Sequence, residues 1–281
     1  MMKNRRIAAL AIALAASLAA ATGVSAATGD TLKIKSANLP EPVKVLVISP
    51  DEAGARNGKT FPTVYLLNGF GGNHTSWSSL QPRLYELSDE YGMIFVMPDG
   101  LDSWYWDSPR DPKMKMETFV TKELVPMIDR KYPTRARRGQ RAISGLSMGG
   151  HGAWWLAIRN PGIFGSAGST SGGVNIMPFA KKWKMEKWLG AQAAAPEVWK
   201  KYTVASLLPG LKEKGLNLIL DCGSEDFFAG VNAELHKALL DAGVPHDYIS
   251  RPGTHNQAYW RNSILYQLLF FDENFKKDNK E

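Results

Sequence analysis

Residues 141–152 of this chain are RAISGLSMGGHG, and this stretch decides the expected fold class. It combines a short strand expected over Arg141 to Ser144, a Gly-x-Ser-x-Gly turn over 145–149 and the start of a helix expected over Gly149 to Asn160. Glycines on both sides of such a turn remove Cβ atoms that would clash, so the central hydroxyl is exposed at the end of a strand. Ser147 is therefore the candidate nucleophile. A glycine-rich turn that carries an ordinary serine is the alternative.

Strands and helices alternate on both sides of this turn, which is typical of an α/β fold. We therefore expect a mostly parallel sheet with helices on both faces and functional residues at the carboxyl ends of the strands. The strands are expected over Thr31 to Ser36, Val43 to Ser49, Thr63 to Leu67, Met93 to Met97, Arg141 to Ser144, near Ser166, and over Leu216 to Asp221 and Tyr248 to Arg251. Besides the helix after Ser147, helices are expected over Leu80 to Tyr91, Met116 to Lys131 with a kink at Pro126, Asn232 to Ala242 and Ala258 to Phe275.

An acid and a histidine follow the candidate nucleophile in the order that this architecture requires. The turn after one late strand contains Glu225 and Asp226, and the loop after the next strand contains His255. Asp226 is preferred, because Asp221 is expected to lie within the strand, and Glu225 stays open as a substitute. His255 would accept the Ser147 proton through one ring nitrogen while Asp226 orients the ring through the other. A solvated loop histidine is the alternative.

Acyl transfer also requires hydrogen-bond donors for an oxyanion. The backbone N–H of Met148, directly after the nucleophile, is one candidate. The second is expected from the glycine-rich loop at residues 68–72, where we choose the N–H of Phe70. This loop lacks the Lys-Ser/Thr ending of a phosphate-binding loop and the spacing of a dinucleotide fingerprint.

No metal or cofactor is expected. The histidines other than His255 form no His-Glu-x-x-His pattern and no plausible set of three ligands. The chain has a single cysteine, Cys222, which excludes an intramolecular disulfide and a thiolate cluster.

Aromatic residues near the candidate site are candidates for substrate contacts. Trp104 and Tyr105 belong to a Trp-Tyr-Trp run that follows the expected strand ending at Met97, and Trp260 lies shortly after His255. Such rings suit carbohydrate or aromatic acyl groups. Core packing of at least one residue of the run is an equal alternative.

The N-terminus predicts a signal peptide over residues 1–26. A basic start with Lys3, Arg5 and Arg6 precedes an apolar stretch, and Val24-Ser25-Ala26 fits a cleavage site. The apolar stretch is shorter than a membrane-spanning helix requires. We therefore expect an exported protein, periplasmic or secreted, with no membrane span after signal removal.

The remaining residues, 27–281, are expected to form a single domain, because they show no internal repeat or low-complexity segment. Residues 177–209 interrupt the alternation and contain Trp183, Trp188 and Trp199. They form either a lid or a pair of surface helices whose tryptophans pack on the body of the protein.

The composition is that of a globular protein. Of 281 residues, 44% are hydrophobic and 22% charged, which excludes a disordered, collagen-like or coiled-coil chain. The formal net charge is +7, and three of the positive charges lie in the expected signal peptide. The remaining excess is too small to indicate nucleic-acid binding.

The residues at these positions resemble an esterase family that includes feruloyl and acetyl xylan esterases, S-formylglutathione hydrolases, tributyrin esterases and mycolyltransferases. The resemblance covers nearly all of residues 27–281 and is carried by Val64 to Trp77, Ser103 to Pro109, Gly145 to Trp154, Gly223 to Phe227 and Pro252 to Trp260. It implies an α/β-hydrolase fold with Ser147 as the nucleophile and Asp226 and His255 completing the triad. One position departs from the family, since members often have His-Gly where this chain has Asn68-Gly69.

The expected activity is that of an exported serine carboxylesterase that acts through an acyl-enzyme. Its substrate would be a small-molecule or carbohydrate ester, with short-chain acyl groups or carbohydrate-linked acetyl or feruloyl groups. Two alternatives stay open, an acyltransferase of the mycolyltransferase type and a catalytically silent carbohydrate-binding protein.

Overall fold

A computed structural model describes residues 26–50 and 58–280 of the chain. Within these residues eight strands form one sheet in the order β1-β2-β4-β3-β5-β6-β7-β8. The six strands from β4 to β8 in this order are parallel to one another, and β2 pairs with β4 and β1 in antiparallel fashion. The strands are β1 (Thr28–Ile34), β2 (Val43–Ser49), β3 (Thr63–Leu67), β4 (Ile94–Pro98), β5 (Arg141–Gly145), β6 (Ser166–Thr170), β7 (Asn217–Gly223) and β8 (Asp247–Arg251).

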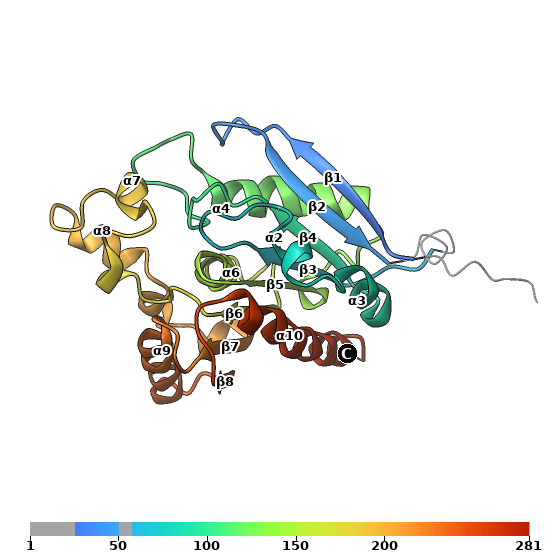
Figure 1. The fold of residues 1–281 in the computed structure, drawn as a ribbon. Helices are drawn as coiled ribbons and strands as arrows, with labels where there is room; N and C mark the ends of the chain where they lie inside the picture. The colour runs from blue at the N-terminus through green and yellow to red at the C-terminus, as the bar shows by residue number, and fades with distance from the viewer. Residues whose placement is uncertain (1–25, 51–57, 281) are drawn as a thin grey trace, which may run out of the picture.

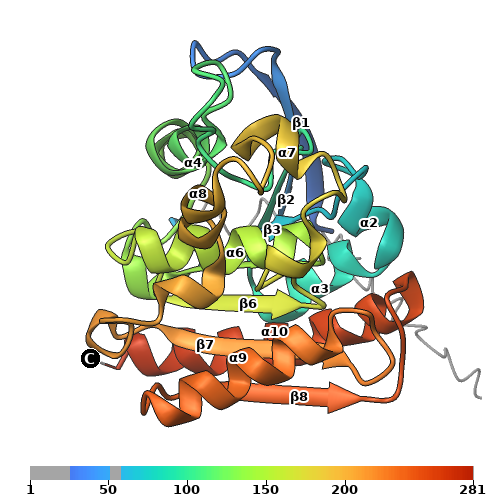
Figure 2. The same ribbon diagram turned by 90° about the vertical axis from the view of Figure 1, so that its left-hand side faces the viewer.

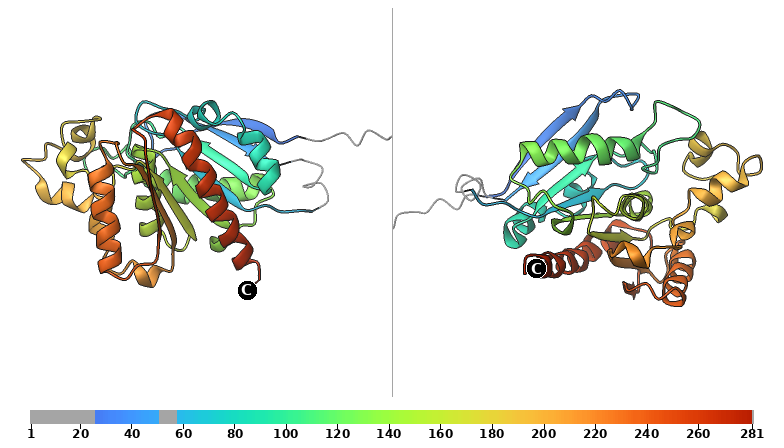
Figure 3. Two further views of the ribbon diagram at one scale, coloured as in Figure 1. Left: turned by 60° about the horizontal axis from the view of Figure 1, so that its bottom comes forward. Right: turned by 180° about the vertical axis from the view of Figure 1, so that it is seen from behind.

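Helices cover both faces of this sheet (Figures 1 and 3). On one face lie α3 (Leu84–Tyr91) and α10 (Gln257–Asp278), and on the other lie α5 (Val125–Lys131), α6 (Met148–Arg159) and α9 (Ala229–Asp241). Each face buries its own apolar cluster, so the core has two layers separated by the sheet. The expected α/β fold with a mostly parallel sheet is confirmed.

Most expected elements agree with the structure to within a few residues, and two show why local patterns mislead. The helix expected over Leu80 to Tyr91 is two helices, α2 (Ser76–Leu80) and α3. The break falls at Gln81, whose φ of −116° and ψ of 89° are extended, because the following Pro82 disfavours a helical residue before it.

The helix expected over Met116 to Lys131 is present as three consecutive helical segments. They are α4 (Met116–Thr118), a π-helical turn over Phe119–Leu124, and α5. Pro126 lacks a backbone N–H and its ring crowds the preceding turn. The wider π-helical turn directly before α5 accommodates the proline.

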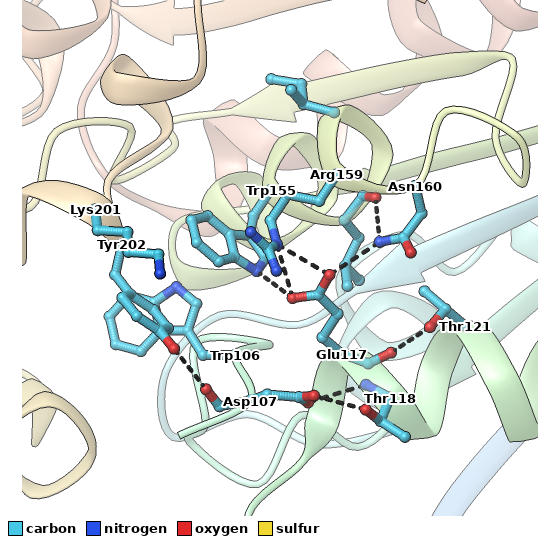
Figure 4. A network of polar contacts seen from close by, with 12 residues as sticks. Trp106, Asp107, Glu117, Thr118, Thr121, Trp155, Arg159, Asn160, Lys201 and Tyr202 are labelled. Carbon is cyan, nitrogen blue, oxygen red and sulfur yellow. Dashed lines mark hydrogen bonds and ion pairs between the residues drawn. The ribbon is translucent and has the colours of Figure 1, made fainter. Parts of the chain in front are cut away.

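A buried carboxylate attaches this helical segment to α6, the helix that follows Ser147 (Figure 4). The Glu117 carboxylate accepts hydrogen bonds from Trp155 Nε1, Arg159 Nε and Asn160 Nδ2, each over 3.0 Å. The Arg159 guanidinium also lies over the Trp155 ring, 4.6 Å from its centroid. Because Glu117 is only 8% exposed, these charge-assisted bonds hold α6 firmly in the body of the protein.

Residues 177–209 contribute the short helices α7 (Met185–Leu189) and α8 (Pro196–Lys201), which project outward from the protein (Figures 1 and 2). Two of their tryptophans are buried: Trp188 Nε1 donates to the Asp102 carbonyl over 2.9 Å and Trp199 Nε1 to that of Gly190 over 2.8 Å. Tyr202, just after α8, donates to the Asp107 carbonyl over 3.0 Å (Figure 4). The segment is thus packed on the body, and its action as a lid stays a prediction.

The expected signal peptide lies outside the described residues except for Ala26, so it also stays a prediction. In the part of the chain that the structure describes, no helix has both the length and the apolar character needed to cross a bilayer.

Candidate active site

Ser147 lies on a tight turn between β5 and α6, with a φ of 56° and a ψ of −117°. A Cβ atom on Gly145 would meet backbone atoms of Gly149 at 2.3 Å, and one on Gly149 would meet the Leu67 carbonyl oxygen at 2.3 Å. Both positions therefore need glycine for the reason given by the sequence motif. The strained turn directs the hydroxyl group of Ser147 away from the sheet.

Ser147, His255 and Asp226 form a continuous hydrogen-bonded chain. His255 Nε2 is 3.0 Å from Ser147 Oγ, and its Nδ1 is 2.8 Å from Asp226 Oδ2 and 3.1 Å from Oδ1. The Asp226 side chain is fully buried, and its Oδ1 also accepts from the Phe228 N–H over 2.8 Å. Glu225 is exposed to solvent, so the geometry favours Asp226 as the partner of His255.

Strand register explains why residues so far apart in sequence meet here. Leu67 pairs with Gly145 at the ends of β3 and β5, which places the loop after β3 beside Ser147. In the same way Gly223 pairs with Arg251 at the ends of β7 and β8, and the Glu225 N–H donates to the Gly253 carbonyl over 3.0 Å. The parallel strands therefore bring four loops to one edge of the sheet.

The two expected oxyanion donors are backbone N–H groups that, in the part of the chain that the structure describes, are free to bind a substrate oxygen. Within residues 26–50 and 58–280, neither the Phe70 N–H nor the Met148 N–H donates to a protein acceptor. By contrast, the neighbouring Gly71 N–H donates to Asp102 Oδ1 over 2.7 Å. Met148 is also the first residue of the twelve-residue helix α6, whose N-terminus favours negative charge.

The Asn68 side chain supplies further hydrogen bonds that support the loop at residues 68–72. Its Nδ2 donates to the Gly69 carbonyl over 2.8 Å, while its Oδ1 accepts from the Gly100 N–H and the Tyr105 hydroxyl, each over 3.0 Å. Asn68 is buried. Asn68, which stands where family members often have histidine, therefore still fixes this loop through three hydrogen bonds.

A cavity of about 640 Å³ opens above Ser147. Its walls include the glycine-rich loop at residues 68–72, which is the expected oxyanion loop, the start of α2, Ser147 and His255. Three aromatic side chains also line it: Trp183, Phe227 and Trp260. Phe227 is 53% exposed and its ring centroid lies 4.2 Å from that of His255, with Trp260 4.8 Å away on the same imidazole. These rings limit the positions that the His255 side chain can take.

Two of the expected substrate contacts lie elsewhere. Trp104 and Tyr105 are buried, at 1% and 0% exposure, and neither lines the cavity. Trp104 stacks on Trp106 at 5.5 Å, and the Tyr105 hydroxyl braces Asn68 instead of facing solvent. The core-packing alternative for this run is therefore the one that the geometry favours.

Sequence reasoning missed Trp183 and Phe227 as cavity residues. The centroids of their stacked rings are 5.7 Å apart, and this contact joins the segment at residues 177–209 to the loop that carries Asp226. The position of Phe227 directly after the acid was an available signal. Nothing local distinguished Trp183 from the other tryptophans of its segment.

His151, one turn after Ser147, is a core residue. It is fully buried, and its Nε2 accepts from Trp106 Nε1 over 2.8 Å while its Nδ1 lies 2.9 Å from the Gly173 carbonyl oxygen. Burial lowers the pKa of His151 to about 4, so its ring is neutral at pH 7. Among the described residues, no three His, Cys, Asp or Glu side chains gather as a metal site would require.

Comparison with known proteins identifies the family. The family model described as "Putative esterase" matches residues 36–271. An acetyl esterase of Caldicellulosiruptor saccharolyticus is 26% identical over 229 residues, covering 74% of this chain and 82% of that protein. An esterase of Mycobacterium tuberculosis is 27% identical over 238 residues, but this chain spans only about half of its length, 52%.

Comparison with solved structures leads to the same family. A structure described as a ferulic acid esterase superposes with a TM-score of 0.75 and 26% identity, covering 89% of this chain and 98% of the other. The chain therefore belongs to this esterase family and has the α/β-hydrolase fold. It is a carboxylic ester hydrolase, and the resemblance seen in the sequence is confirmed.

Proposed function

We propose that the protein is an exported serine carboxylesterase that works through an acyl-enzyme, with Ser147, His255 and Asp226 as its catalytic residues. The observation that carries the proposal is the hydrogen-bonded chain from Ser147 Oγ through His255 to the buried Asp226 carboxylate, at the floor of an open cavity. This is the arrangement that activates a serine hydroxyl, whose own acidity is too weak for attack at neutral pH.

In this mechanism Ser147 Oγ attacks the ester carbonyl carbon while His255 Nε2 accepts its proton. The developing oxyanion is held by the Phe70 and Met148 N–H groups, which donate to no acceptor among the described residues of the protein. When the tetrahedral intermediate collapses, the C–O bond to the alcohol breaks and His255 returns the proton to the departing oxygen. Water, deprotonated by His255, then releases the acid from the acyl-serine by the reverse sequence of steps.

We propose short-chain acyl esters or carbohydrate-linked acetyl and feruloyl esters as substrates. The cavity of about 640 Å³ is large enough for a small acyl group with part of its alcohol. The exposed faces of Trp183, Phe227 and Trp260 suit a sugar ring or an aromatic acyl group. Relatives named acetyl esterase and endo-1,4-beta-xylanase/feruloyl esterase support the same class.

A labelling experiment tests the nucleophile. A fluorophosphonate reagent should modify Ser147 in the purified protein, as peptide mass spectrometry would show. Ser147→Ala should lose hydrolysis of p-nitrophenyl acetate by several powers of ten, as other triad deletions do. Ser250→Ala, which alters an exposed serine of β8, is the matched control and should keep both labelling and rate. Labelling at another serine, with activity intact in Ser147→Ala, would overturn the mechanism.

Product analysis tests hydrolysis against acyl transfer. The protein should release free acid from acetylated xylan or feruloylated oligosaccharides, at a rate little changed by added sugars or alcohols at low concentration. A predominantly transacylated product in water, detected by mass spectrometry, would favour the acyltransferase alternative.

Export is tested separately: the N-terminus of the protein recovered outside the cytoplasm should be Ala27.

A further inference from the structure

Asp102 lies between the oxyanion loop and the insertion at residues 177–209. Its Oδ1 accepts the hydrogen bond from the Gly71 N–H over 2.7 Å, and its Oδ2 forms an ion pair with Lys184 Nζ at 3.1 Å. Its backbone carbonyl accepts from Trp188 Nε1 over 2.9 Å. One residue therefore contacts the loop that carries Phe70 and two side chains of the insertion.

Lys184 also contacts the loop at residues 68–72 directly. Its Nζ lies 5.4 Å from the centroid of the Phe70 ring, within the range of a cation–π contact. The residue before it, Trp183, lines the cavity and stacks on Phe227. The Trp183-Lys184 pair thus faces the histidine side of the cavity with one side chain and the oxyanion side with the other.

Both ends of the ion pair lie on backbone that most residues avoid. The φ angles are 49° at Leu101, 53° at Asp102, 47° at Trp183 and 55° at Lys184. This left-handed region is sterically costly for residues with a Cβ, and especially for a bulky tryptophan. Such backbone persists where surrounding contacts impose it, and these contacts join the two segments.

The consequence for the oxyanion donor follows from peptide geometry. The Phe70 N–H shares one planar peptide with the Gly69 carbonyl, and the Phe70 carbonyl shares the next with the Gly71 N–H. Asn68 holds the first plane through the Gly69 oxygen, and Asp102 holds the second through the Gly71 nitrogen. With both planes held, the direction of the Phe70 N–H is set before substrate binds, as an effective oxyanion donor requires.

We propose that Asp102 is a positioning residue that holds the oxyanion loop in its productive conformation, and that Lys184 makes this hold depend on the insertion. The inference rests on the proposed serine mechanism, because it concerns a group that stabilises the transition state. The insertion then has a part in catalysis that needs no opening or closing movement.

Steady-state kinetics on p-nitrophenyl acetate test the proposal, together with the inhibition constant of an aryl trifluoromethyl ketone. Such ketones form a tetrahedral serine adduct whose oxygen occupies the oxyanion site. Asp102→Ala should lower kcat about tenfold and raise the inhibition constant by a similar factor, with KM within twofold. A misplaced donor should cost less than the loss of 10²-fold or more seen when a donor is removed.

Graded variants separate the two contacts of Asp102. Asp102→Asn keeps an oxygen acceptor for Gly71 but loses the charge that attracts Lys184, so a loss of about threefold is expected. Lys184→Met should cost about the same, since an ion pair whose lysine is 62% exposed contributes modestly. The double variant Asp102→Asn/Lys184→Met should lose less rate than the product of the two single losses, because the two substitutions share the ion pair. Asp241→Asn, which breaks the exposed Lys237–Asp241 pair on α9, is the matched control and should leave every constant unchanged.

Results that differ from these expectations would contradict the proposal. Kinetics of Asp102→Ala within twofold of the parent would overturn it, and so would a raised KM with unchanged kcat, which would make Asp102 a substrate contact. A rate loss with an unchanged inhibition constant would show a general structural defect. Losses that multiply in the double variant would refute the coupling through Lys184. If the parent enzyme shows Ser147-dependent hydrolysis and these results fail, only this inference falls; labelling of a serine other than Ser147 would overturn both proposals.

Discussion

The side-chain amide of Asn68 donates to the carbonyl oxygen of Gly69 over 2.8 Å. Because C=O and N–H point in opposite directions across a trans peptide, this bond directs the Phe70 N–H away from Asn68. Asn68 Oδ1 accepts hydrogen bonds from the Gly100 N–H and the Tyr105 hydroxyl. The side chain therefore cannot rotate without losing three hydrogen bonds. The buried side-chain amide of Asn68 thus orients the Phe70 N–H, the expected oxyanion donor.

Asn68→Ala should therefore lower kcat by about tenfold or more and destabilise the protein by about 1–3 kcal/mol. The rate falls because the Gly69–Phe70 peptide loses the Asn68 hydrogen bond and keeps only that from the Gly72 N–H, over 3.0 Å. The stability falls because buried donors are left unpaired. Tyr105→Phe is the control, since it removes a donor to Asn68 but leaves the bond to Gly69. It should lose stability with a much smaller change in kcat. Equal rate losses in the two variants would argue against a specific role of the Gly69 bond. Denaturant unfolding and esterase kinetics measure both effects.

Asp226→Asn should cost far more rate than Glu225→Gln. Asp226 is buried and accepts from His255, so the asparagine would favour the wrong tautomer of the imidazole, a change that costs about 10⁴-fold in a serine protease triad. Glu225 is exposed, so its neutral variant should stay within twofold of the parent. Measuring kcat/KM for both variants decides the assignment, which the reverse ranking would overturn.

His151 should make the protein less stable in mild acid. Its folded pKa of about 4 lies below the ordinary value of 6.5 because of burial. Between these values the unfolded chain binds a proton that the folded protein does not, so the contribution is complete above pH 6.5 and lost as pH falls to about 4. The total is about 3 kcal/mol. His151→Asn keeps a donor for Gly173 and should show a correspondingly flatter dependence of unfolding free energy on pH. Parallel curves for the two proteins would contradict this origin.

Cys222 should be unreactive in the folded protein. Burial, together with the nearby carboxylates of Asp226 and Asp221, raises the pKa of the Cys222 thiol, so the reactive thiolate is scarce. Iodoacetamide should leave esterase activity unchanged and should modify Cys222 only after unfolding in urea, as intact mass would show. Rapid alkylation of the native enzyme would place the thiol nearer to solvent than this structure does.

Local sequence was sufficient for the nucleophile turn and for the order of its partners. The Gly-x-Ser-x-Gly motif works through backbone close to itself, since Gly145 and Gly149 approach one another and Leu67 too closely for any Cβ. Alternating strands and helices likewise imply a parallel sheet, and in such a sheet loops that follow strands meet at one edge. The placement of Ser147, Asp226 and His255 near one another follows from these two facts.

The position of Trp260 at the cavity was expected from the sequence, but tertiary structure decided which of the other aromatic residues face it. Trp104 and Tyr105 follow a strand end, as a pocket wall would, yet their left-handed backbone turns both side chains into the core. Trp183 reaches the cavity from a segment whose other two tryptophans are buried. The contact of Asp102 with Gly71 and Lys184 joins residues 31 and 82 positions away from it. Composition and periodicity report the burial of a segment as a whole, whereas the direction of a single side chain depends on backbone torsions and on distant partners that only the folded chain brings together.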